Sequence, residues 1–560
     1  MAERITQLEQ AAGLSQPAET RQITPSSSIS HSAVPSISHD ISSLRSPVDT
    51  INSTSHRDTP QYTSTSALED PVVAEQDERI AEATVTDQVM PSMNQDQLEY
   101  WENAASKTCS AILRLPTEKV EHLLKTHFNW IHPMFLFVPR VPFMRDAASG
   151  GRFFSELLLC VICLHATRFT DHSLSKELLG RVRLLLGHEI HRAPSVPTVQ
   201  ALLQLSAREM GKGLVSRAWL YSGMGFRMGV DLGIFTRSRA RDVALDPELE
   251  RVRQQIAWSS YVWDRIISLY LGRLPTIPDV PEFDPPIMDD ISEDSMWLPY
   301  AEEARGWNPL PARIFSTFAN FCKLVIIISD ILTTVYARDR PSQIMDFVHA
   351  TRARLEQWRA ESPAYLHVDA SAESCPPPHI LAQSTLYYTS RILLHRPFRH
   401  DPQCQTICRE AAQEVEDLIL LLEKSFGLSH CTYLMSYSAY TAATVALQDL
   451  HDGLDGAQAK INTCLRALYA VRSSCPGIQT SINIVIRNLD RRPVAPKPQV
   501  EQQQQQFSSA IDTGPTYTFD GGWDELNPSV GDFSTLAFNG LDNFAYGFAA
   551  DLDDNYLNAF

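Results

Sequence analysis

The chain has 560 residues, of which 44% are hydrophobic and 20% charged, so it can build a sizeable buried core. It has no apolar run of about 18 residues and no basic-then-apolar start, which predicts a soluble intracellular protein without a membrane span or signal peptide. The net charge of −18 comes from the two ends, because residues 1–95 carry 13 acids against 5 bases and residues 501–560 carry 10 acids and no base. The middle is nearly neutral. This argues against direct binding to nucleic acid, which depends on basic surfaces.

The first 95 residues predict a disordered, acidic arm. Residues 13–68 are dominated by Ser, Thr, Pro and Gln with scattered single aliphatic residues. Such a segment cannot bury enough apolar area to offset the entropy of ordering it. Residues 3–14 place Ile5 and Leu8 at helical spacing, which is weak evidence for the end of a coiled coil.

Residues 96–492 predict one large all-α domain, because apolar residues recur there at steps of three and four and strand alternation is nearly absent. The best-marked helix runs from Asp246, a good N-cap followed by Pro247, to a C-cap at Gly272. A proline-rich acidic insertion occupies residues 279–294. The other main helices are expected at residues 154–164, 178–188, 199–205, 314–336, 344–358, 380–394, 407–425, 432–451 and 457–472.

Beyond residue 492 the composition changes twice. Residues 493–506 form a Pro- and Gln-rich linker, and residues 507–560 form an acidic tail that contains 11 aromatic residues. A purely solvating tail should have few aromatic residues. The pattern therefore favours an activation segment, in which acidic repulsion keeps the aromatic side chains available for a partner's apolar groove. The expected anchors are Trp523, Phe533, Phe538, Phe544 and Phe548.

No constellation of residues predicts catalysis or metal binding. Cys160-x-x-Cys163 has no second pair nearby, and we interpret it and the other eight cysteines as buried free thiols of a reducing compartment. His127 and His132 are five residues apart, which does not place them on one helix face and favours packing over metal binding. The glycines near Gly223 follow no strand, so close helix packing explains them better than a phosphate loop.

A series of phrases in the middle of the chain resembles the fungal-specific transcription factor domain, the middle homology region of fungal zinc binuclear-cluster regulators. The resemblance covers about residues 118–400 and depends on the order and spacing of its phrases together. In this sequence they are His132-Pro133-x-Phe135-x-Phe137-Val138, Thr198-Val199-Gln200-Ala201-Leu202-Leu203, Ala218-Trp219-x-Tyr221-Ser222-Gly223-Met224, Asp264-Arg265…Ser268-x-Tyr270-x-Gly272-Arg273 and Leu394-His395-Arg396-Pro397-Phe398.

The resemblance implies a nuclear, largely helical regulatory scaffold without catalytic residues. In the family this region lies between a DNA-binding cluster of two zinc ions and six cysteines and a C-terminal activating segment. Here the first cysteine is Cys109, so the two zinc ions have no ligand cluster, and we expect no cofactor and no DNA-binding residue in this chain. Residues 3–14 resemble the coiled coil that often follows the cluster, which favours a start just downstream of that module.

We therefore expect a fungal transcription regulator that controls a pathway or biosynthetic gene cluster through partners rather than through direct DNA contact. Its tail would bind the transcription machinery or co-activators, and the chain could pair with itself or with a zinc-cluster factor. Two alternatives stay open: a co-regulator that acts by pairing with a zinc-cluster factor, and, more remotely, an all-helical enzyme. A small-molecule effector also stays open.

Inside the helical domain, several residues are expected to pack or pair. The predicted ion pairs are Arg227 with Asp231, four residues apart on one helix, and Asp264 with Arg273. The residues expected to pack in the core are Trp219, Tyr221, Met224, Trp258 and Trp263.

Overall fold

The computed structural model describes residues 95–169, 172–235, 246–285, 291–298, 309–337, 341–371 and 375–489. Helices dominate these residues, which confirms the all-α fold class. The predicted disordered arm up to residue 94, the whole linker and the tail with its five anchors lie outside the described residues. Their boundaries therefore stay predictions.

In the N-terminal half of the described chain, one helix follows another along the sequence. α8 packs on α6 and α9, and α3 packs on α4 and α5. Between α4 and α5 the chain forms a π-helical turn, η3 (His127–Ile131), and a 3-10 turn, η4 (His132–Met134). The helices are α3 (Gln95–Leu113), α4 (Thr117–Thr126), α5 (Arg140–Ser149), α6 (Glu156–Ala166), α7 (His172–Glu189), α8 (Val196–Gly211), α9 (Val215–Asp231) and α10 (Pro247–Leu271).

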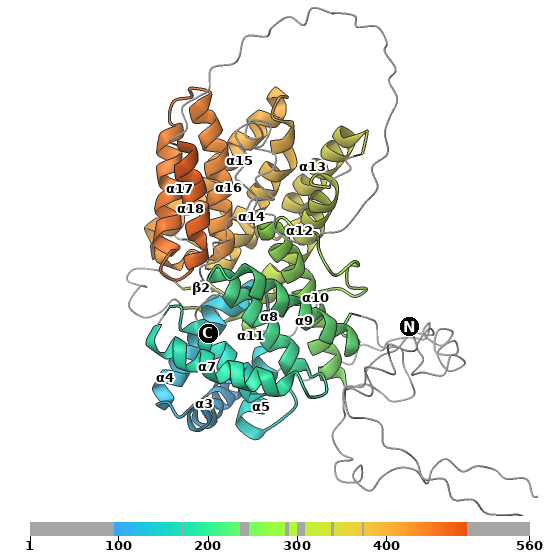
Figure 1. Cartoon of the computed structure of the whole chain (residues 1–560), viewed down its shortest axis with the longest axis vertical. Coiled ribbons are helices and arrows are strands. Elements are labelled where there is room, and N and C mark those ends of the chain that lie inside the picture. Colours follow the sequence, from blue (N-terminus) through green and yellow to red (C-terminus); the bar gives the residue numbers. More distant parts are fainter. Residues whose placement is uncertain are drawn as a thin grey trace, which may run out of the picture. The chain divides into compact units, whose positions relative to one another are not determined.

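The C-terminal half continues the pattern, and Figure 1 shows α14 to α18 side by side. Two-residue strands, β1 (Met296–Trp297) and β2 (Leu310–Pro311), form a short antiparallel ladder that pairs Met296 with Pro311. The helices are α11 (Ile291–Asp294), α12 (Ile314–Thr334), α13 (Ile344–Glu361), α14 (Pro378–His395), α15 (Pro402–Phe426), α16 (Tyr433–His451), α17 (Ala457–Val471) and α18 (Gln479–Leu489). Short 3-10 turns lie at η5 (Ala364–Leu366), η6 (Arg396–Phe398), η7 (Leu428–His430) and η8 (Pro476–Ile478).

The ends of α10 confirm the sequence prediction in detail. The Asp246 carboxylate accepts a hydrogen bond from the Glu248 N–H, and Pro247 occupies the first helical position. Gly272 ends the helix in the left-handed region, with φ of 62°. Capping depends on residues within one helical turn, so it can be predicted without knowing what packs around the helix.

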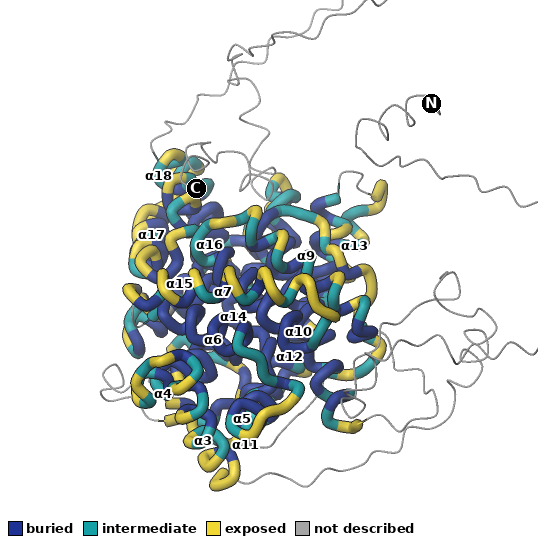
Figure 2. Tube along the Cα trace, turned by 60° about the horizontal axis from the view of Figure 1, so that its bottom comes forward, coloured by how far each residue is buried: buried dark blue, intermediate teal, exposed yellow. Residues whose placement is uncertain are grey.

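The core runs through both halves of the described chain. Figure 2 shows buried segments of α6, α10, α12 and α14 in the interior, whereas α3 and α4 turn exposed residues outward. Among the described helices, α12 is long and apolar enough to cross a membrane. Most of its residues are buried, however, and it contacts α10, α13 and α14, as a core helix does.

The glycines of α9 pack as predicted at two positions out of three. A Cβ on Gly225 would touch Leu202 and Leu203 of α8, and one on Gly229 would lie 2.9 Å from the Phe235 ring. Gly223 faces open space, because nothing lies within 4 Å of its Cβ position.

A closer backbone contact joins the two halves. Gly213, just after α8, has φ of 77°, and a Cβ built on Gly477 in η8 would lie 2.7 Å from its Cα and N atoms and 3.0 Å from the Met210 carbonyl oxygen. Such distances leave no room for a methyl group. The crossing therefore requires glycine on both sides.

We expect Gly477→Ala to lower the free energy of unfolding by about 1–3 kcal/mol, since the added methyl forces two backbones apart. Urea unfolding of the purified chain measures the change. Gly223→Ala is the matched control and should raise stability by about 0.5–1 kcal/mol, because a helical glycine with open space around it gains from alanine. Equal stability of Gly477→Ala and the parent would contradict the crossing.

Candidate functional site

The phrase His132-Pro133-x-Phe135-x-Phe137-Val138 forms a buried, irregular stretch of chain at the centre of the described residues. Leu136 has φ of 47°, a left-handed conformation that a leucine adopts only when its surroundings hold it there. Its carbonyl oxygen accepts hydrogen bonds from the Gln255 side chain at 2.7 Å and from the Ser259 hydroxyl at 3.0 Å. The Phe137 carbonyl accepts one from Gln200 at 3.0 Å. The Leu136 and Phe137 carbonyls lie outside regular helices, and side chains of α8 and α10 supply their hydrogen-bond donors.

The aromatic residues of this phrase anchor it between α10 and α16. The rings of Phe135 and Phe137 stack with centroids 5.3 Å apart, and Trp263 of α10 meets both edge-on. Tyr433 of α16 stacks on Phe135 at 6.0 Å. The indole N–H of Trp263 donates to the Ser206 hydroxyl at 2.9 Å, which pairs the one polar atom of that ring.

A chain of polar side chains crosses the core beside this phrase. The Gln204 amide nitrogen lies 3.2 Å from Nε2 of His127, and its amide oxygen lies 3.0 Å from Nδ1 of His165. All three residues are buried. Burial lowers the pKa of His127 to about 3 and holds that of His165 well below its usual value, with Arg168 adding to the effect. Both imidazoles are therefore neutral at physiological pH.

Two further histidines are buried in the same state. Burial holds the pKa of His132 well below its usual value, and His127 and Arg140 lower it further. Burial also lowers the pKa of His379 to about 4, although its hydrogen bond to the Ala312 carbonyl, at 2.6 Å, favours the charged form. The rings of His127 and His132 lie 6.5 Å apart, too far to share a metal ion. Packing, as predicted, accounts for this pair.

The cysteines also behave as predicted, because all ten are free and buried. Burial raises the pKa of Cys109 and Cys160 to about 12, and that of Cys163 well above its usual value. Thiols held protonated are poor nucleophiles and poor metal ligands. No group of three His, Cys, Asp or Glu side chains suited to a metal ion occurs among the described residues.

Both predicted ion pairs are wrong. The Asp264 carboxylate, which is fully buried, pairs with the neighbouring Arg265 at 3.0 Å and accepts hydrogen bonds from the backbone N–H groups of Thr276 and Ile277 at 2.7–3.0 Å. Arg273 lies instead over the Trp219 ring, with its guanidinium carbon 4.9 Å from the centroid. The loop after α10 folds back onto the helix, so its N–H groups reach the carboxylate.

The other predicted pair fails because its arginine faces solvent. Arg227 is exposed on α9, and no ion pair with Asp231 is found in the described part of that helix.

The residues predicted to pack in the core divide into two groups. Trp258 and Trp263 are buried, whereas Trp219, Tyr221 and Met224 of α9 are half-buried and pack against the core.

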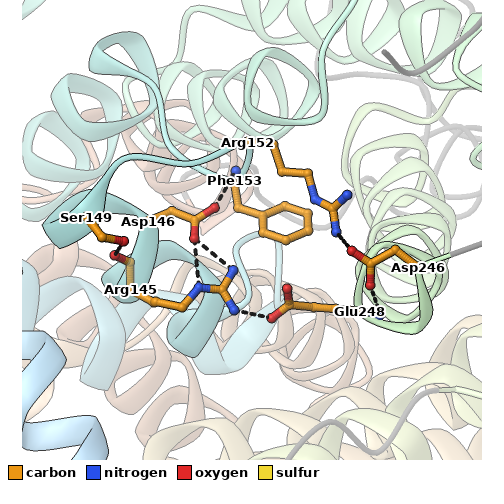
Figure 3. Close-up of polar contacts among 7 residues, drawn as sticks. All are labelled: Arg145, Asp146, Ser149, Arg152, Phe153, Asp246 and Glu248. Carbon is orange, nitrogen blue, oxygen red and sulfur yellow. Dashed lines mark hydrogen bonds and ion pairs between the residues drawn. The ribbon is translucent and has the colours of Figure 1, made fainter. Parts of the chain in front are cut away.

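A polar cluster that the sequence did not reveal ties α5 to the start of α10 (Figure 3). The Arg145 guanidinium donates to Glu248 at 2.6 Å and to Asp146 at 2.8 Å, and the second oxygen of Asp146 accepts from the Phe153 N–H at 2.9 Å. Arg152 pairs with Asp246, the N-cap of α10. The cluster holds two segments about a hundred residues apart in sequence.

We expect Glu248→Gln to lower the free energy of unfolding by about 1 kcal/mol, because it weakens a charged hydrogen bond at a partly exposed site. Glu250→Gln is the matched control: it removes the same charge from the same helical turn, but Glu250 contacts Gln254 of its own helix. Urea unfolding separates the two. If both variants lose the same stability, the effect belongs to the helix dipole rather than to Arg145.

Among the described residues, one surface hollow is lined by few titratable groups: Glu423, Arg466 and Tyr469. This hollow of about 710 Å³ between α15 and α17 is mostly apolar and open, and its lining residues include Leu428, Leu465 and Tyr469. The buried imidazoles and thiols lie away from it, inside the packed core. The arrangement is that of a helical scaffold whose polar groups hold its own backbone.

Comparison with known proteins identifies the scaffold. Residues 124–360 match the family model of the fungal specific transcription factor domain. The match confirms the resemblance over a shorter span than the expected 118–400. It includes the irregular phrase, the histidine chain and α10. The family consists of transcription factors, which are not enzymes, and this agrees with the prediction that the chain is not an enzyme.

Relatives with similar sequences are named as transcription factors. The chain is 26% identical to the nitrogen assimilation transcription factor nit-4 of Neurospora crassa, over 65% of this chain and 36% of that protein. It is 25% identical to the nitrogen assimilation transcription factor nirA of Emericella nidulans, over 59% and 40%. It is 23% identical to the TY1 enhancer activator of Saccharomyces cerevisiae, over 54% and 43%. The chain thus spans less than half the length of these three relatives. No solved structure matches it.

Proposed function

We propose that the chain regulates transcription in the nucleus of a fungal cell. The observation that carries this proposal is the match of residues 124–360 to the fungal specific transcription factor domain. The helical body, residues 96–492, would act as the regulatory scaffold. Residues 507–560 would recruit the transcription machinery or co-activators, and the genes controlled would belong to a pathway or a biosynthetic cluster.

The chemistry of the body supports a scaffold. Its buried histidines are neutral and its buried thiols protonated, so neither kind of group is poised for acid–base or nucleophilic work. Gln200 and Gln255 donate hydrogen bonds to backbone carbonyls of the irregular phrase. A rigid core of this kind suits a domain that transmits contacts between partners.

The composition of the tail supports the activating role. It combines acidic residues with aromatic residues, which a purely solvating segment would lack. Aromatic anchors that stay exposed can fold into an apolar groove of a partner on binding. Contact with basic partners would be speeded by the acidic charge.

The cysteines favour the alternative in which the chain is a co-regulator without its own DNA-binding cluster. The ten cysteines, beginning with Cys109, are free and buried in the body, and they lack the Cys-x2-Cys-x6-Cys spacing of a two-zinc cluster. A chain that acts on promoters would then reach DNA by pairing with a zinc-cluster factor or through a further module. In this variant the chain is a co-regulator, and its partner determines the target sequence.

Transcript profiling of a deletion strain tests the proposal. We expect a defined set of transcripts to change, and the full chain to restore them. A chain that lacks residues 507–560 should restore few of them, although it should reach the same nuclear concentration as the full chain. A deletion strain whose transcripts match the parent under nutrient shifts and stress would oppose a role in transcription.

A further inference from the structure

A small, partly enclosed pocket lies where α6, α7 and α8 meet the segment before η8. Its cavity volume is about 10 Å³, which is enough for one water-sized atom. Three cations line it: Arg168 follows α6, Arg208 lies in the last turn of α8, and Lys212 ends that helix. The other polar residues of the wall are His165, Thr167, Ser175 and Ser474. We name this site the basic pocket.

The charge of the basic pocket is not balanced by its own walls. None of its nine described lining residues is acidic. Glu209, behind the wall, pairs with Arg208, but its other oxygen lies 3.3 Å from Arg217, so one carboxylate serves two arginines. Within the described residues, no ion pair joins Arg168 or Lys212 to a carboxylate, and Glu209 acts on Lys212 only through space.

The surroundings of Arg168 and Lys212 also indicate that a negatively charged partner is missing. The Nε atom of Arg168 is buried and has no hydrogen-bond partner among the described residues, and its guanidinium lies over the Phe169 ring at 4.4 Å. A buried donor without a partner costs free energy, so a bound acceptor would stabilise it. Burial lowers the pKa of Lys212, and the positive charge of Arg208 lowers it further. A nearby anion would reverse that effect.

The C-terminus of α8 does not account for this charge. A helix C-terminus carries about half a negative charge, and it favours cations in the last turn. Arg208 and Lys212 benefit from it, but Arg168 belongs to a different segment of chain. Half a charge does not balance three cations. Two of the three are half-buried and therefore only partly screened by water.

We propose that the basic pocket binds a small oxyanion. One oxygen would occupy the cavity, and Arg168, Arg208 and Lys212 would balance its charge. The cavity admits a single atom, so larger groups would extend toward solvent. Because Ser474 precedes η8, whereas Arg168 follows α6 and the other two cations lie at the end of α8, a bound anion would tie the matched domain to the C-terminal helices. This proposal does not depend on a role in transcription.

Thermal unfolding of the purified full chain tests the site. Sodium phosphate and sodium acetate are titrated at an ionic strength held constant with sodium chloride. We expect at least one oxyanion to raise the unfolding midpoint in a saturable way. Binding of phosphate alone would assign a tetrahedral, multiply charged ligand, and binding of acetate as well would assign carboxylates too. No rise above the chloride baseline with either anion would overturn the proposal.

Variants locate the effect. Lys212→Met keeps the aliphatic stem and removes the charge, and it should weaken the apparent affinity at least tenfold. Lys323→Met makes the same change at an exposed position of α12, away from the pocket, and should leave the titration unchanged. If Lys212→Met does not fold, Arg168→Gln replaces it with the same expectation. A titration that both pocket variants leave unchanged would contradict binding at this site.

Discussion

Lowering the pH from about 6.5 to 5 should destabilise the helical body by several kcal/mol. Four histidines that share a buried, neutral state cause the effect: His127, His132, His165 and His379. In the unfolded chain each imidazole takes up a proton near pH 6.5, whereas in the folded chain His127 does so only at about 3 and His379 at about 4.

The sign follows from the number of protons that each state binds. Below pH 6.5 the unfolded state binds more protons than the folded state, so stability is fully present above this pH and is lost as the pH falls toward the folded pKa values. At pH 5 His127 and His379 each cost about 2 kcal/mol, and His132 and His165 act in the same direction. The whole stability of an ordinary domain is about 5–15 kcal/mol, so the loss is a large part of it.

Urea unfolding at a series of pH values between 5 and 7 measures this dependence. His165→Gln removes one buried imidazole and should reduce the slope by about 1.4 kcal/mol per pH unit at its acidic end. His367→Gln, at an exposed position, is the control and should leave the slope unchanged. A body as stable at pH 5 as at pH 7 would contradict the neutral state of these histidines.

Replacing the aromatic anchors of the tail should abolish activation of transcription. Each anchor can contribute about 1.5–3 kcal/mol when fully buried in a groove. Much of that free energy is lost to ordering the chain, so the affinity for each partner site should be modest. The loss of all five anchors should therefore abolish binding to the partner. The experiment uses residues 507–560 fused to a heterologous DNA-binding domain, and the anchors changed to Ala are Trp523, Phe533, Phe538, Phe544 and Phe548.

The matched variant keeps the anchors and removes charge. It should weaken activation partly and make partner binding less sensitive to salt, because the acids mainly keep the anchors exposed and speed encounter. Reporter activity in a fungal cell, at equal protein levels, compares the two variants. If the aromatic variant activates as well as the parent, the tail serves solubility. The acids changed to Asn are Asp520, Asp524, Asp532, Asp542 and Asp551.

The sequence predicted those parts of the fold that depend on local signals. The capping residues of α10 and the helices between residues 314 and 472 are present with ends that differ by a few residues. Apolar periodicity and caps act within a few turns of one helix, and tertiary packing moves only the ends. The burial of the cysteines followed in the same way from their apolar surroundings.

The polar interior could not be predicted, because it depends on contacts between distant segments. Gln255 meets Leu136 across more than a hundred residues, and Gln204 joins His127 to His165. From sequence alone, a glutamine in a helix is expected at the surface, because its buried hydrogen-bond partner is not known. The irregular phrase around Leu136, which has a left-handed backbone conformation, needs side-chain hydrogen-bond donors for its buried carbonyls. The sequence alone does not show which distant residues supply them.

The wrong ion pairs have the same origin. Sequence spacing placed Asp264 near Arg273, but the loop that follows α10 brings the N–H groups of Thr276 and Ile277 to the carboxylate instead. Two backbone donors and the adjacent Arg265 then satisfy it. Spacing along a helix predicts which residues can meet, but it does not show which donors a folded-back loop supplies.

Chromatin immunoprecipitation of the epitope-tagged full chain tests the proposed regulation of transcription most directly. We expect the chain to be enriched at promoters of the genes whose transcripts change in the deletion strain, whether it reaches them through a zinc-cluster partner or through another module. A nuclear chain with uniform background signal across the genome, or a chain excluded from nuclei under all conditions, would contradict a role in transcription.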